Sequence, residues 1–207
     1  AGEEPVLAYL AEVDGGTVMR LRTGVASPPT IVGMPLDYSF GPRVALTDTG
    51  PALLMATPSG LTLHRGPLAE LVAVAAPTSR PTLAFGHERL VSAWTRSDGL
   101  VVRREAFELN LEATEPASPS LVPIATGWVL AWTVAGKNDT GVAAALLTVD
   151  ATLATTLKEV AEYTFDDQDG IRLAPFGDDV LAVWRSDWFD GDPSGIVVRR
   201  LTPTLSN

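Results

Sequence analysis

The stretch LAVWRSDWFDGDPSGIVVRR, residues 181–200, has a shorter counterpart in VSAWTRSDGLVVRR, residues 91–104. Each begins with an apolar run that ends in tryptophan, continues through a turn containing Ser, Asp and Gly, and returns through Val-Val-Arg-Arg. The two arms match, while the connection between them differs in length. Internal repetition of this kind has to be established first, because it determines how every other segment is interpreted.

The apolar runs recur along the whole chain. Aligned on the last aromatic position, they place Trp94, Trp132 and Trp184 at equivalent positions, with Ala56 and Tyr9 at matching places nearer the start. Successive positions lie 38 to 52 residues apart. Five degenerate copies of one unit therefore cover nearly all of the 207 residues.

Each unit has the composition of consecutive strands. The tryptophan-ended run is apolar on both faces, as an inner strand is, and the run after the turn mixes apolar residues with arginine, as a more exposed strand does. Adjacent strand residues point to opposite faces, so we expect the arginine pairs at 103–104 and 199–200 to separate. A further short strand precedes the tryptophan run at 82–86 and 172–177. Residues 152–163 could be read as a helix, although Thr and Val dilute its period.

Repeats of about 40–50 residues with three or four strands each are typical of β-propeller blades. We therefore predict an all-β chain that forms a single β-propeller domain over residues 1–207, with about five degenerate repeats and four or five blades. A β-sandwich is the alternative fold. The predicted repeats are approximately 1–41, 42–80, 81–120, 121–170 and 171–207.

The unit resembles the divergent propeller repeats of secreted bacterial proteins. In those repeats a short strand ends in Trp, a turn with Ser, Asp and Gly follows, and a strand that carries Arg comes next. The resemblance covers most of the chain and implies a β-propeller. Ala1 followed by Gly-Glu-Glu-Pro would also suit the product of signal-peptidase cleavage. We therefore expect an extracellular, periplasmic or cell-surface location.

The composition is that of an ordered, acidic protein. Apolar residues make up 46 % and charged residues 19 % of the chain, as in folded domains. The formal net charge of −10 repels phosphate backbones and argues against a nucleic-acid partner. The lack of Cys excludes disulfides and thiolate metal sites. No apolar run approaches the roughly 18–20 residues of a membrane span.

Sequence motifs for catalysis are missing. Neither His64 nor His87 stands in a recognisable relation to a serine nucleophile or a metal triad, and the HExxH, GxSxG, P-loop and GxGxxG patterns are absent. Carboxylate pairs for glycoside hydrolysis could be assembled from loops at one end of a propeller, but the sequence does not select among them. We therefore predict no catalytic residue.

Two acidic loops are candidate Ca²⁺ sites, at residues 165–170 and 186–195. Closely spaced carboxylates on a glycine-containing turn can supply several of the about six to eight oxygens that Ca²⁺ takes. The same residue types also form hydrogen bonds that stabilise tight turns, which is the alternative reading. The predicted ligands are Asp166, Asp167 and Asp169 in the first loop and Asp187, Asp190 and Asp192 in the second.

The second acidic loop also carries Trp188 and Phe189. It is six residues longer than the turn after Trp94, and binding often resides on such loops of a rigid scaffold. We predict that both aromatic side chains are partly exposed and contribute to a surface for a protein partner or a sugar. Packing against the blade edge is the alternative.

These observations favour a non-catalytic binding or protein-interaction module whose ligand is a carbohydrate or a protein. One alternative is a glycosidase-like propeller hydrolase, which requires two carboxyl groups facing each other across one pocket. Another is a structural subunit of a larger assembly, which requires no ligand-sized pocket.

The first and last units are incomplete. Val6 already lies in a tryptophan-type strand, and Leu201 ends the arginine-bearing strand of the fifth unit, which leaves sheet edges that invite pairing. We expect the N-terminal strands to join the C-terminal ones in a shared blade. The alternative is a partner chain that completes the ring.

Overall fold

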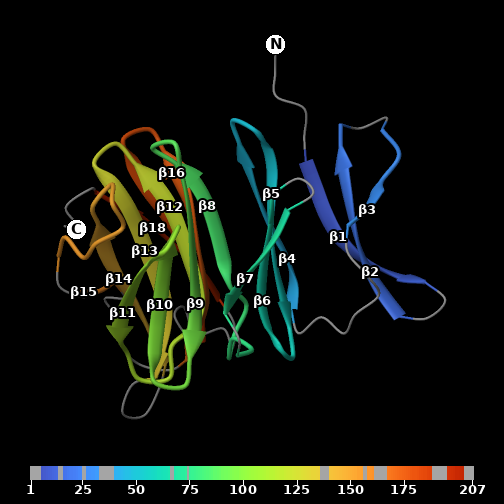
Figure 1. The fold of residues 1–207 in the computed structure, drawn as a ribbon. Helices are drawn as coiled ribbons and strands as arrows, with labels where there is room; N and C mark the ends of the chain where they lie inside the picture. Colours follow the sequence, from blue (N-terminus) through green and yellow to red (C-terminus); the bar gives the residue numbers. More distant parts are fainter. Residues whose placement is uncertain are drawn as a thin grey trace. The chain divides into compact units, whose positions relative to one another are not determined.

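The computed structural model describes residues 6–13, 16–24, 27–32, 40–65, 68–73, 75–135, 140–155, 158–160, 167–187 and 195–202. All regular structure in these residues is β-strand, arranged in five antiparallel sheets (Figure 1). The chain divides into two compact units, Ala1–Pro77 and Thr78–Asn207. The described residues include no helix with the length and apolar character needed to cross a membrane.

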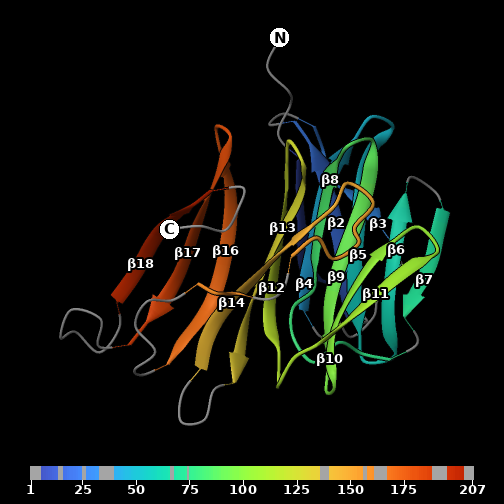
Figure 2. The same ribbon diagram turned by 90° about the vertical axis from the view of Figure 1, so that its left-hand side faces the viewer.

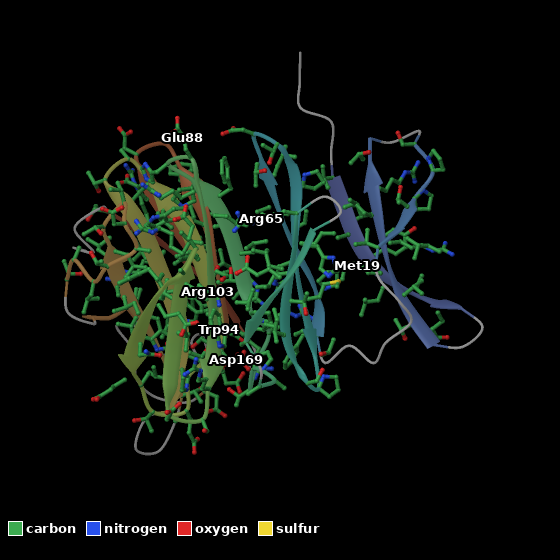
Figure 3. The ribbon with its side chains drawn as sticks, viewed as in Figure 1. Met19, Arg65, Glu88, Trp94, Arg103 and Asp169 are labelled. Carbon is green, nitrogen blue, oxygen red and sulfur yellow. The ribbon has the colours of Figure 1, made fainter. Side chains whose placement is uncertain are left out.

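The first unit contains two sheets, in each of which strands that follow one another in sequence pair antiparallel. Its core lies between these sheets and is centred on Met19, Leu53 and Met55, each at most 3 % exposed. Figure 3 labels Met19 on the second strand. The strands are β1 (Val6–Val13), β2 (Gly16–Thr23) and β3 (Thr30–Val32), then β4 (Phe40–Thr47), β5 (Gly50–Thr57), β6 (Gly60–Arg65) and β7 (Leu68–Ala73).

The second unit contains three sheets of the same meander type, which Figure 2 shows side by side. The first has β8 (Thr82–Gly86), β9 (Arg89–Arg96), β10 (Gly99–Arg104) and β11 (Phe107–Glu112). The second has β12 (Ala117–Ile124), β13 (Gly127–Ala135), β14 (Thr140–Leu147) and β15 (Lys158–Glu159). The third has β16 (Gln168–Phe176), β17 (Asp179–Ser186) and β18 (Gly195–Leu201).

The β12–β15 sheet is the middle layer of the second unit and is buried on both faces. Trp128 and Trp132 pack with Val91 of the β8–β11 sheet, whereas Val129, from an intervening position, packs with Trp184 of the β16–β18 sheet. Successive side chains of a strand point to opposite faces. A strand covered on both sides must therefore be apolar throughout, which explains the run GWVLAWTVA of β13.

The tryptophan-ended runs are the second strands of their sheets, as predicted. Trp94 lies in β9, Trp132 in β13 and Trp184 in β17, and each side chain is at most 4 % exposed; Figure 3 labels Trp94. The arginine pairs separate as expected. In β10, Arg103 forms an ion pair of 3.6 Å with Glu108, and Arg104 pairs with a different carboxylate.

Three predicted repeat boundaries fall inside strands. The boundaries after residues 41, 120 and 170 lie within β4, β12 and β16, so these sheets begin two to four residues earlier. Each of these first strands contains a register shift near its start, and a bulge interrupts the alternating pattern from which a strand is read. A single domain over residues 1–207 stays a prediction. The described residues of the candidate helix at 152–163 are not helical. Leu153 forms an isolated β-bridge with Leu147, and residues 158–159 form β15.

Candidate functional site

A cavity of about 730 Å³ opens at one end of the β8–β11 sheet, where the β9–β10 turn meets the end of β11. This volume lies in the range of about 300–1,000 Å³ that small-molecule sites occupy. The cavity is lined by Arg96, Asp98, Gly99, Leu100, Val101, Asn110, Leu111, Glu112, Ala113 and Thr114.

The strand register explains why these residues meet. Gly99 pairs with Arg96 on one side and with Glu112 on the other. Two residues along β10, Val101 pairs with Asn110. Residues directly opposite each other in neighbouring strands project from the same face, as do residues two apart in one strand. Arg96, Asn110 and Glu112 therefore lie on one face of the sheet.

Gly99 allows β10 and β11 to approach each other closely at the centre of this lining. Its φ is +158°, and a Cβ atom there would lie 2.5 Å from the carbonyl oxygen of Leu111. A larger residue would therefore force β10 and β11 apart.

The lining carries charges of both signs. The guanidinium of Arg96 is half-exposed and lies 3.8 Å from the carboxylate of Glu108, which stands just outside the lining. Asp98 and Glu112 add two exposed carboxylates. In the part of the chain that the structure describes, no hydrogen bond or ion pair engages the side chains of Asp98, Asn110 or Glu112. These groups are available to a ligand.

The described residues 167–170 and 186–187 of the two acidic loops meet at one end of the β16–β18 sheet. The backbone amide of Asp187 donates to the carbonyl oxygen of Asp167, and the guanidinium of Arg185 lies 3.0 Å from Asp169 and 3.6 Å from Asp187. The carboxylate of Asp167 accepts hydrogen bonds of 3.2 Å from both the amide and the hydroxyl of Thr140. Figure 3 labels Asp169. These three aspartates thus have partners within the protein.

The remaining predicted site residues lie outside the described residues: Asp166, Trp188, Phe189, Asp190 and Asp192. Across the described ranges, no group of three or more acidic or histidine side chains is placed to hold a metal ion. Calcium binding and the aromatic loop surface therefore stay predictions.

The two histidines have structural surroundings. Nε2 of His87 lies 2.8 Å from the carbonyl oxygen of Ile124 and 3.1 Å from that of Gly127, so this nitrogen is the protonated donor. The ring also packs edge-on against Trp128. His87 thereby joins the β8–β9 turn to the next sheet. His64 is half-buried on β6, and burial lowers its pKa.

Comparison with known proteins shows similarity in fold only. No family model and no curated protein matches the chain. Among solved structures it is similar to the subtype N10 neuraminidase-like protein of A/little yellow-shouldered bat/Guatemala, with a TM-score of 0.57, 9 % identity, and coverage of 80 % of this chain and 56 % of that one. It is also similar to TolB from Acinetobacter baumannii, with a TM-score of 0.53, 10 % identity, and coverage of 95 % and 55 %.

Both are β-propeller proteins. The chain has a β-propeller fold. It spans a little over half the length of these two relatives. A third similar structure is an endo-1,4-beta-xylanase from Bacteroides thetaiotaomicron, with a TM-score of 0.53, 10 % identity, and coverage of 94 % of this chain and 88 % of that one. The antiparallel meanders correspond to the blades of this fold.

Sequence reasoning did not find the cavity. The Ser-Asp-Gly turn at 97–99 was recognised as a turn of the repeat, but not the outer strand β11 that completes the lining. Strand β11 is mostly exposed, and Leu111 is its one buried residue. Its sequence FELNLE therefore gives a weak strand signal. The available signal was the alternation of Leu109 and Leu111 with Glu108, Asn110 and Glu112.

Proposed function

We propose that this β-propeller is a non-catalytic binding module whose cavity at the β9–β10 turn takes a neutral carbohydrate. The observation that carries the proposal is the set of side chains around one hollow: a guanidinium, two carboxylates, an amide and a hydroxyl, from Arg96, Asp98, Glu112, Asn110 and Thr114. Sugar hydroxyls both donate and accept hydrogen bonds, so they can pair with every member of such a mixed set.

Charge favours a neutral ligand over an anion. The lining holds one cationic and two anionic side chains, and the whole chain has a net charge of −10. A phosphate or polyanionic ligand would meet repulsion both at the cavity and during approach. The ten lining residues include no aromatic side chain, so recognition would rest on polar contacts instead of ring stacking. The similarity in fold to an endo-1,4-beta-xylanase gives weaker support.

A glycosidase is the second candidate, because Asp98 and Glu112 line the same cavity. Glycoside hydrolysis uses two carboxyl groups about 5–10 Å apart, one of which acts as an acid and is commonly held in an apolar pocket. Both carboxylates here are exposed. This exposure favours binding over catalysis. A ligand-sized cavity likewise disfavours a purely structural subunit.

The test is a binding screen against neutral oligosaccharides, including xylan and arabinan fragments, followed by titration calorimetry on any ligand found. We expect Asn110→Ala and Glu112→Gln each to weaken binding about tenfold, since each removes a hydrogen-bonding group from the cavity. Asp48→Asn is the matched control, because Asp48 is also exposed but lies on the β4–β5 turn and is not among the lining residues.

The same samples distinguish the alternatives. Chromatography of the incubated oligosaccharides would show shorter products if the protein is a glycosidase, and Glu112→Gln should then abolish them. Running the screen with Ca²⁺ and with chelator separates binding in the cavity from binding that depends on the acidic loops. Binding that is unchanged in both cavity variants would contradict the proposal.

A further inference from the structure

The guanidinium of Arg96 pairs with the more distant of two carboxylates on β11. Arg96 and Glu112 stand in one row across the sheet, through their common partner Gly99. Glu108 stands opposite Arg103, two rows away. Neighbouring strands lie about 4.8 Å apart, and each row adds about 6.6 Å along the strand, so Glu112 is the nearer position. The ion pair of 3.8 Å nevertheless joins Arg96 to Glu108.

A second guanidinium explains this pairing. Arg103 lies 3.6 Å from Glu108, and its Nε donates a hydrogen bond of 2.8 Å to the carbonyl oxygen of Glu105. The Arg103 side chain, labelled in Figure 3, is 19 % exposed, compared with 42 % for Arg96. Arg103 is therefore the more firmly held of the two arginines. It fixes Glu108 through Oε1, and Glu108 presents Oε2 to Arg96.

The carboxylate of Glu112 has no such fixed cation beside it. Within the described residues no hydrogen bond or ion pair engages it, although Arg96 lines the same cavity. If Arg96 turned toward Glu112, the two charges would neutralise each other inside the cavity. The carboxylate would then be occupied and would no longer accept a hydrogen bond from a ligand. The pairing of Arg96 with Glu108 prevents this.

We propose that Glu108 is a positioning residue for the cavity: it holds Arg96 away from Glu112 and so keeps the Glu112 carboxylate available to a sugar hydroxyl. This role rests on the proposed carbohydrate binding. Glu108 itself is not among the lining residues, so it acts on the ligand only through Arg96.

Glu108→Gln removes the charge that holds Arg96 and keeps the size of the side chain. Arg96 is then expected to pair with Glu112 in its own row, and a ligand has to break this ion pair to bind. Exposed ion pairs are weak, so we expect the Kd of the xylan or arabinan fragment that binds the parent chain to rise about three- to fivefold. Titration calorimetry measures the change.

Glu105→Gln is the matched control. Glu105 is an exposed carboxylate of the same sheet that also pairs with an arginine, Arg89, at 3.6 Å, and it does not line the cavity. Its substitution removes an equivalent charge without releasing Arg96. The Kd should therefore stay unchanged.

Two further measurements separate positioning from a structural role. In a Glu112→Gln background there is no carboxylate at this position for Arg96 to capture, so adding Glu108→Gln should not weaken binding further. Raising the salt concentration from about 0.1 M to about 1 M shortens the Debye length from about 10 Å to about 3 Å. The difference between the parent chain and Glu108→Gln should then largely disappear, whereas a loss caused by altered packing would persist.

Carboxylate labelling tests the positioning without any sugar. A carbodiimide with an amine nucleophile should modify Glu112 of the free parent chain about as fast as Glu88, an exposed carboxylate on the β8–β9 turn that Figure 3 labels. In Glu108→Gln the new ion pair should slow the modification of Glu112 about threefold and leave that of Glu88 unchanged. Adding Arg96→Ala should restore the parent rate. Peptide mass spectrometry measures both sites in one digest.

Unchanged labelling of Glu112 in Glu108→Gln would overturn the proposal, whether or not a sugar binds. Equal losses of sugar binding in Glu108→Gln and Glu105→Gln would also overturn it, as would a loss that persists in the Glu112→Gln background. If no oligosaccharide binds but the labelling changes as expected, the carbohydrate function is rejected and Glu108 is still the residue that holds Arg96 away from Glu112. Circular dichroism of each variant establishes that the fold is retained.

Discussion

The backbone amide of Asp187 donates a hydrogen bond of 3.0 Å to the carbonyl oxygen of Asp167 and so joins the acidic segment before β16 to the acidic segment after β17. Arg185 strengthens the junction through ion pairs with Asp169 and Asp187. Thr140 of β14 adds a link from the neighbouring sheet. Two segments that are separated in sequence by strands β16 and β17 therefore share one network of hydrogen bonds and ion pairs.

Thr140→Val is expected to lower the free energy of unfolding by about 1–2 kcal/mol. The hydroxyl donates to the carboxylate of Asp167 and accepts from the amide of Gln168 at 2.9 Å, and the substitution leaves that amide and carboxylate without this partner. Chemical denaturation checks the value. Thr133→Val is the control, since its buried hydroxyl has no hydrogen-bond partner among the described residues. It should leave stability unchanged or slightly higher; equal losses in both variants would contradict a role for the network.

Calcium binding by the acidic loops is tested by thermal unfolding with excess Ca²⁺ and with chelator. Binding to the folded state stabilises it by about 2.7 kcal/mol when free ion is a hundredfold above Kd. Asp190→Asn combined with Asp192→Asn should remove most of that increase if the second loop is responsible. Because Arg185 already pairs with Asp169 and Asp187, Ca²⁺ would have to compete for these carboxylates. Equal melting temperatures in the two conditions would reject both loops.

The repeat made much of the fold predictable. Trp94, Trp132 and Trp184 mark second strands because these strands are largely apolar and end in a buried tryptophan, and that composition is visible in the sequence. The outer strands were not predictable in the same way. In β11, four of six residues are exposed, and an exposed strand is defined by its pairing partner more than by its composition.

The candidate site was less accessible to sequence reasoning for a related reason. Arg96 and Glu112 are sixteen residues apart and meet through their common pairing with Gly99. The strand register sets this contact, and the register depends on the geometry of the connecting turns as well as on the apolar pattern. For the acidic loops, the residues were easy to find in the sequence but their contacts were not. Their composition was obvious, but the partners of their aspartates, Arg185 and Thr140, could be assigned only from the structure.

Gly127→Ala is expected to destabilise the protein by about 2 kcal/mol or more. The residue has a φ of +148°, and an added Cβ would overlap the carbonyl oxygen of Leu147 on the paired strand β14, so the backbone must shift. Gly50→Ala is the control, because Gly50 follows an equivalent two-residue turn with a φ of +117° and has nothing within 4 Å of the added atom. Both variants bear the strain of the positive φ. A loss no larger at Gly127 than at Gly50, measured by chemical denaturation, would show that the overlap is relieved at little cost.

His64 should make stability fall as the pH decreases below neutrality. Burial lowers its pKa from the ordinary value of 6.5, so over the interval between the two values the unfolded chain binds a proton that the folded chain does not. Stability declines with falling pH wherever the unfolded state binds more protons. His64→Gln removes this proton uptake while keeping a polar side chain on β6. The variant should therefore lose less stability than the parent chain between about pH 7 and pH 5, where unperturbed imidazoles titrate. If the free energy of unfolding changes with pH in the same way in both proteins, His64 is protonated as easily in the folded strand as in the unfolded chain. The loss of stability in acid would then come from the carboxylates of the fold.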